Sequence, residues 1–107
     1  MAKYLISASY TAEGAKGLMK DGGTKRRQAA DQAIKSAGAK LDAFYFAFGE
    51  NDAVVIIDAP DHATVAAASV AINASGAVHS LTTVLLTPEE IDQAVKKTVS
   101  YRAPGQS

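Results

Sequence analysis

The sequence predicts an α+β fold in which a four-stranded antiparallel sheet carries two helices on one of its faces. Runs rich in β-forming residues alternate with runs whose apolar residues recur at helical spacing. The predicted elements follow the order strand, helix, strand, strand, helix, strand, with a further helix at the end, which is typical of a ferredoxin-like sandwich. A chain of 107 residues suffices for one such domain and not for two.

The first strand is predicted at residues 4–10, and Thr11 is a suitable N-cap for the helix that follows. That helix contains four glycines, each of which costs about 1 kcal/mol in a helix interior. We therefore expect an interruption at Gly22-Gly23 and a new start with Thr24 as N-cap. Gly38 should end the second part. Its apolar stripe is predicted to consist of Ala30, Ala33, Ile34 and Ala37.

A β-hairpin is predicted from two strand-like runs, residues 41–48 and 53–59. Its connection fits a two-residue turn led by Gly49 or a four-residue loop. Either even-length connection assigns the side chains to the same two faces. One face would hold Phe44, Phe46, Phe48, Ala53, Val55 and Ile57. The other would hold Leu41, Ala43, Tyr45, Ala47, Asp52, Val54, Ile56 and Asp58.

The remaining elements have clear boundary signals. Pro60 and Asp61 end the hairpin and begin a helix that Gly76 closes. Its predicted stripe is Val65, Ala68, Ser69 and Ile72. Residues 78–86 are the predicted fourth strand. A capping box then starts a last helix at Thr87, Pro88 and Glu90. The apolar face of this last helix is predicted to be Ile91, Ala94 and Val95.

Two helices cover only one face of such a sheet, although both hairpin faces are largely apolar. The uncovered face would match or exceed the roughly 300–600 Å² of the largest apolar patch on a typical monomer. We therefore expect a homodimer, or a higher even oligomer, in which these faces pack together about a two-fold axis. The alternative is that the last helix folds across this face.

Composition excludes several classes of function. Without cysteine there is no disulfide, thiolate zinc site or cysteine nucleophile. Eleven Lys and Arg residues balance eleven Asp and Glu residues, so the basic excess of a nucleic-acid-binding protein is missing. No apolar run approaches the ~20 residues of a membrane span, and we expect no signal peptide before the first strand. We expect a cytoplasmic protein without cofactor, metal, membrane or nucleic-acid partner.

The segment GGTKRR is the first candidate ligand site. Its glycines allow backbone N–H groups to approach a ligand, and a helix start with three cations, Lys25, Arg26 and Arg27, suits an anion. The glycine spacing does not match a Walker loop. The alternative interpretation is a solvated helix start with a glycine hinge.

Further candidates come from the strands. Tyr45 and Asp52 are predicted on one face near the hairpin end, where a phenol beside a carboxylate can hold a ligand hydroxyl or act as a base. Tyr10 is a candidate polar contact at the end of the first strand, and His79 lies early in the fourth. Each of these residues also fits an ordinary surface or packing role. His79 and His62 lack the neighbouring ligands that a metal site needs.

Four stretches in order carry a resemblance to a known family: KYLISASYTAEGAKGLMKDGGTKRR, FYFAFGENDAVVIIDAPD, LTTVLLTPEEIDQAV and YRAPG. With them the chain resembles the GYD domain family of small bacterial proteins over nearly its whole length. Gly49 and Asp52 match the name-giving motif, whereas Asn51 stands where tyrosine is expected. The resemblance implies a dimeric α/β-barrel type of fold in a single domain, residues 1–107, with a core of about 3–98 and a tail at 99–107. It implies no established activity.

Three functions remain open on these observations. The first is a homodimer that binds a small ligand, which can be anionic, between sheet and helices, with Tyr10, Tyr45, Asp52 and Arg27 as polar contacts. The second is a cofactor-free enzyme, an oxygenase or isomerase, which would use His79, Asp52 or Tyr45 as its titratable group. The third is an assembly module that acts through the second sheet face and the C-terminal tail.

Overall fold

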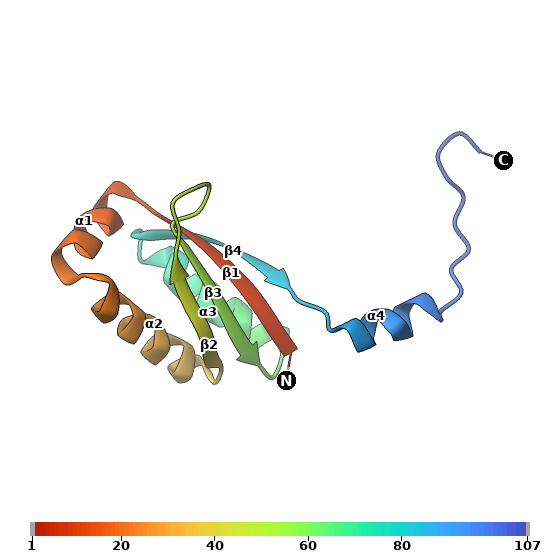
Figure 1. Cartoon of the computed structure of the whole chain (residues 1–107), viewed down its shortest axis with the longest axis horizontal. Coiled ribbons are helices and arrows are strands. Elements are labelled where there is room, and N and C mark those ends of the chain that lie inside the picture. The colour runs from red at the N-terminus through yellow and green to blue at the C-terminus, as the bar shows by residue number, and fades with distance from the viewer. Residues whose placement is uncertain (1, 107) are drawn as a thin grey trace.

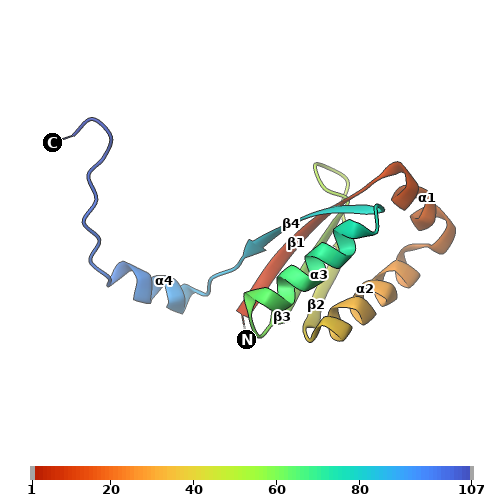
Figure 2. The ribbon, with the colours of Figure 1, turned by 180° about the vertical axis from the view of Figure 1, so that it is seen from behind.

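The computed structural model describes residues 2–106, which form one four-stranded sheet and four helices (Figure 1). The elements are β1 (Ala2–Tyr10), α1 (Ala12–Asp21), α2 (Gly23–Ala37), β2 (Lys40–Phe46), β3 (Ala53–Ala59), α3 (His62–Ala74), β4 (Val78–Val84) and α4 (Pro88–Val95). The sheet is antiparallel throughout, in the order β2-β3-β1-β4. Figure 2 shows α2 and α3 side by side on one face of it. The predicted ferredoxin-like fold is confirmed.

The core lies between this helix-covered face and the two helices. Strand β3 alternates between buried residues on the covered face and half-buried residues on the other, as the period of two in a strand requires. Ile34 of α2 and Val65 and Ala68 of α3 are buried against the sheet, so both predicted stripes point inward. The main buried cluster consists of Tyr4, Ile6, Ile34, Ala39, Val55, Ile57, Ala59, Val65 and Ala68.

The break between α1 and α2 occurs where the glycines predict it, but the cap differs. Gly22 has a φ of 81°, which is unfavourable for other residues, and its N–H bonds to the Leu18 carbonyl. It ends α1 and also occupies the N-cap position of α2, without a side-chain cap. The prediction of Thr24 as N-cap is therefore wrong, because a single glycine makes the whole turn. Gly38, with a φ of 97°, ends α2 as predicted.

The hairpin has a β-bulge that the sequence pattern did not predict. The pairing of β2 with β3 shifts between Leu41 and Ala43, so that Asp42 is an extra residue. Leu41 therefore pairs with Ile57 on the covered face, and its predicted place beside Ala43 is wrong. The Ala47 N–H bonds to the Asp52 carbonyl at 2.8 Å, which leaves a four-residue loop, residues 48–51, with Phe48 fully exposed.

The C-terminal segment extends away from the rest of the molecule (Figure 1). Helix α4 begins with the predicted capping box between Thr87 and Glu90, and all of its residues are exposed. The Cα radius of gyration is 17.2 Å, compared with about 13 Å for a compact domain of this length. Helix α4 does not fold across the uncovered sheet face, so that alternative is wrong for the single chain.

Candidate functional site

A cavity of about 330 Å³ lies between the covered sheet face and helices α2 and α3. It forms because small side chains face each other there: Ala8 and Ala53 are paired on the sheet, and alanines of α2 lie opposite. Methyl groups are too short to fill the space between helix and sheet. The apolar lining is Ile6, Ala8, Ala29, Ala30, Ala33, Ile34, Phe44, Ala53, Val55, Ile72, Ala77 and Val78.

Four polar side chains join this lining, namely Tyr10, Arg26, Ser75 and Ser80. The hydroxyl of Ser80 donates to Asn73 Oδ1 at 3.0 Å, and that of Ser75 donates to the Ile72 carbonyl at 2.7 Å. Arg26 lies half-buried in the first turn of α2, where the helix dipole disfavours a cation. None of the ion pairs within residues 2–106 includes it. The cavity thus combines an apolar interior with one uncompensated positive charge.

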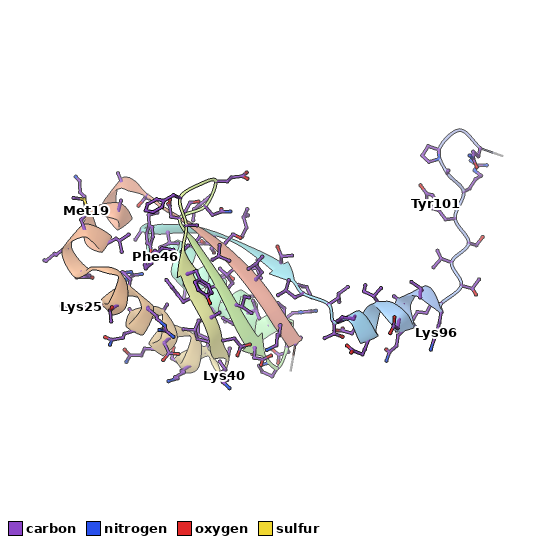
Figure 3. All side chains as sticks on the ribbon, viewed as in Figure 1. Met19, Lys25, Lys40, Phe46, Lys96 and Tyr101 are labelled. Carbon is purple, nitrogen blue, oxygen red and sulfur yellow. The ribbon has the colours of Figure 1, made fainter. Side chains whose placement is uncertain are left out.

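The other predicted site residues lie outside this lining. Lys25 and Arg27 flank Arg26 on α2 but are exposed. Tyr45 pairs with Val54 on the uncovered face and is 69% exposed, and His79 is exposed on β4. Figure 3 shows Lys25 and Phe46 on neighbouring elements near the junction of α1 and α2. Of the predicted set, the structure brings Tyr10 and Arg26 together at one cavity.

Asp52 forms structural hydrogen bonds at the end of the sheet. Its Oδ2 accepts the Tyr10 N–H at 2.8 Å, and its own N–H donates to the Ala8 carbonyl at 2.9 Å. These bonds join the hairpin to the end of β1 and satisfy backbone groups that would otherwise have no strand partner. The carboxylate of Asp52 therefore positions Tyr10 by binding the Tyr10 backbone N–H.

A second, more open cavity of about 340 Å³ lies between α3 and β4. Within it the Tyr4 hydroxyl is 2.7 Å from His62 Nδ1, and the two rings meet edge to face. The residues that line it are Tyr4, His62, Val65, Ala66, Ser69, Thr82 and Val84. This pair was not among the residues predicted from the sequence. Its signal was a tyrosine at a core position of β1, because a buried phenol needs a hydrogen-bond partner.

Two charged side chains outside the cavities have shifted pKa values. Hydrogen bonds to Asp42 and Asp58 raise the pKa of Lys3. The Thr64 N–H, which donates to Asp61 at 2.8 Å, lowers the pKa of that carboxyl. Across residues 2–106 no group of three or more His, Cys, Asp or Glu side chains is placed to hold a metal ion. None of the described helices is long and apolar enough to cross a membrane.

Comparison with known proteins agrees with this architecture. No curated protein sequence matches the chain. A crystal structure of MtbAldR is similar at a TM-score of 0.57 and 19% sequence identity, over 96% of this chain and 58% of the other. The chain thus corresponds to little more than half of that protein, and the likeness shows a shared fold. The GYD domain model matches residues 4–95, and the chain therefore belongs to the GYD domain family.

Proposed function

We propose that this GYD domain protein binds a small, mainly apolar molecule that carries an anionic group, in the cavity between the sheet and helices α2 and α3. The observation that carries the proposal is the half-buried Arg26, the one charged residue at a cavity whose lining is mostly apolar. A volume of about 330 Å³ falls within the range of small-molecule sites, roughly 300–1,000 Å³.

Each part of the lining has a distinct role in this proposal. The alanines of α2 and the sheet side chains contact the apolar body of the ligand. Arg26 binds its carboxylate or similar group, since a guanidinium donates two parallel hydrogen bonds to the oxygens of such an anion. The Tyr10 hydroxyl offers a further polar contact. Lys25 and Arg27 contribute only to the potential that attracts the anion.

We also propose that the protein works as a homodimer whose uncovered sheet faces pack together. Leu81 and Tyr45 are about 70% exposed on this face, and Leu5, Val54 and Ile56 are only half-buried. Apolar side chains gathered on one face of a sheet are typical of a protein–protein contact. The cavity lies on the opposite side of the sheet, so assembly leaves it accessible.

The test uses anilinonaphthalene sulfonate, an apolar anionic dye, with decanoate as competitor. We expect saturable dye binding that decanoate displaces, and about a tenfold loss of affinity in Arg26→Ala, the effect of one charge-assisted contact. Arg27→Ala is the matched control, because it removes an adjacent cation that does not line the cavity. Ala33→Phe should block binding by filling the cavity.

Equal losses in Arg26→Ala and Arg27→Ala would contradict the assigned role of Arg26, since they would indicate a general effect of charge. Undiminished binding in Ala33→Phe would place the dye elsewhere. Native mass spectrometry of the protein purified from its own host should then show a reproducible small adduct on the wild type and none on Ala33→Phe.

A further inference from the structure

The C-terminal arm, residues 85–106, exposes apolar side chains at intervals, and none of the residues of its helix α4 is buried against its own chain. Helix α4 is amphipathic, with Ile91, Ala94 and Val95 on one face. Figure 3 shows Lys96 and Tyr101 far from Phe46 and the body of the molecule. The exposed large apolar residues of the arm are Leu86, Ile91, Val95, Val99 and Tyr101. An amphipathic helix normally gains its stability by burying such a face.

The accessible surface area of the chain, compared with that of a compact monomer, indicates how much surface a partner could cover. The accessible surface is 7679 Å². A compact monomer of 11.1 kDa exposes about 5,700 Å². The excess of about 2,000 Å² per chain is as large as a whole stable protein–protein interface, which buries about 1,200–2,000 Å² in total. A second copy of the chain can supply that surface.

The direction of the arm is set by the sheet. The Leu85 N–H donates to the Lys3 carbonyl at 3.0 Å, which continues the pairing of β4 with the start of β1. The hairpin loop lies at the other end of β1, where Asp52 bonds to Tyr10. Arm and hairpin loop therefore leave the sheet at opposite ends (Figure 1).

The hairpin end also exposes large apolar side chains. Phe48 is fully exposed in the loop, and Tyr45, 69% exposed, lies on the uncovered face near the end of β2. Phe46 points to the covered face, so we refer to Phe48 and Tyr45 alone as the hairpin patch. A two-fold axis that crosses the strands between two stacked sheets brings opposite ends of the two sheets together. With the axis inclined to the strands, the arm, which leaves from the β4 edge, comes beside the hairpin patch at the opposite, β2 edge of the other copy.

We propose that the C-terminal arm packs on the hairpin patch of a second copy, with the apolar face of α4 against Phe48 and Tyr45. The inference rests on the proposed self-association and is independent of the ligand. The reach of α4 is sufficient: residues 85–87 can extend about 10 Å and α4 itself spans about 12 Å, which together cover about the length of one strand. A seven-residue strand of the partner spans only about 23 Å.

The test uses the absence of cysteine from the chain, so that introduced cysteines give unambiguous disulfides. An Ile91→Cys chain and a differently tagged Phe48→Cys chain are mixed under mild oxidation and separated without reductant. We expect a doubly tagged dimer as the main product. Gln93→Cys with Phe48→Cys is the matched control, because position 93 lies on the opposite side of α4, and it should cross-link at least about tenfold more slowly.

Other products would overturn the proposal in identifiable ways. A disulfide within single chains of the Ile91→Cys/Phe48→Cys double variant would show that the arm folds back on its own body. Rapid Ile91→Cys self-pairing in place of the mixed product would show that two arms pack together. Either result leaves the proposed dimer and ligand site intact, whereas a monomer in light scattering at micromolar concentration would contradict the self-association as well.

A second measurement needs no disulfide. In the full-length chain, Ile91→Ser/Val95→Ser removes two exposed apolar side chains per copy and should leave the monomer fold intact. We expect the dimer dissociation constant to rise about a hundredfold or more, measured by dilution in sedimentation velocity. Gln93→Ser should leave it unchanged. An unchanged constant in the double variant would overturn the proposal.

Discussion

The two faces of strand β3 carry similar side chains but lie in different surroundings. Ile57 on one face is completely buried under the helices, whereas its neighbour Ile56 on the other face is half-buried and contacts solvent. The same contrast holds for Val55 and Val54. Apolar composition alone therefore does not decide which side of the sheet becomes the core. The helices cover one side, and the other apolar side stays exposed to solvent in the single chain.

The largest effect that tests this comparison comes from matched substitutions at the two isoleucines. Ile57→Ala removes a buried side chain and leaves a cavity, so we expect the free energy of unfolding to fall by about 2–5 kcal/mol. Ile56→Ala should lower it by about 1 kcal/mol in the monomer, because part of that side chain is already exposed. Urea unfolding at low protein concentration measures both.

At higher protein concentration, the effects of the two isoleucine variants on self-association should rank in the opposite order to their effects on the free energy of unfolding. Ile56→Ala should weaken the proposed dimer in sedimentation velocity more than Ile57→Ala does. Equal losses of unfolding free energy at low concentration would show that both faces are covered to the same extent, and the comparison would fail.

An intermediate effect is expected at two glycines of α1, one of which packs against the body of the protein while the other faces open space. A Cβ at Gly14 would lie 2.0 Å from the Ala77 carbonyl oxygen, whereas a Cβ at Gly17 would meet nothing within 4 Å. Gly14→Ala should therefore cost about 1–3 kcal/mol through overpacking. Gly17→Ala should stabilise the protein by about 0.5–1 kcal/mol through helix propensity. Thermal unfolding of both variants, compared with wild type, gives the sign of each change.

The smallest effect concerns the start of α3, one of the helices that cover the core. Because the pKa of Asp61 lies below its ordinary value of 3.8, the unfolded chain binds the proton more readily. The stabilisation from this cap is therefore complete above about pH 4 and is lost as the pH falls through the lower folded-state pKa. Asp61→Asn retains a capping oxygen and should lose this dependence.

An NMR titration of the Asp61 carboxyl, alongside urea unfolding from pH 6 to pH 2, checks this prediction. The difference in unfolding free energy between wild type and Asp61→Asn should shrink as the pH falls. A difference that stays constant over this range would contradict the assigned cap.

Much of the fold could be predicted because its signals are local. The glycine break, the Asp61 cap, the capping box at Thr87 and the stripes of α2 and α3 each depend on residues within a few positions of one another. The bulge at Asp42 could not be predicted, because it depends on how β2 pairs with β3. The bulge moves Leu41 from the uncovered to the covered face, so both faces hold a different set of side chains from the predicted one.

The candidate site was predictable only in part, for the same physical reason. Cations at the start of α2 were evident, but only tertiary packing distinguishes the half-buried Arg26 from its exposed neighbours Lys25 and Arg27. Asp52 was assigned a ligand contact, whereas the structure shows its carboxylate on the Tyr10 backbone. Ser75 and Ser80 join the cavity because α3 and β4 come together there.

By itself the sequence determined the order of the elements, most of their boundaries, the antiparallel ferredoxin-like arrangement and the presence of two apolar sheet faces. These features follow from periodicity and capping, which operate over a few residues. Tertiary structure decided which face is covered, where alanines meet to leave a cavity, and that the C-terminal arm extends away from the body. Those outcomes depend on contacts between residues far apart in the chain, and local propensity does not specify such contacts.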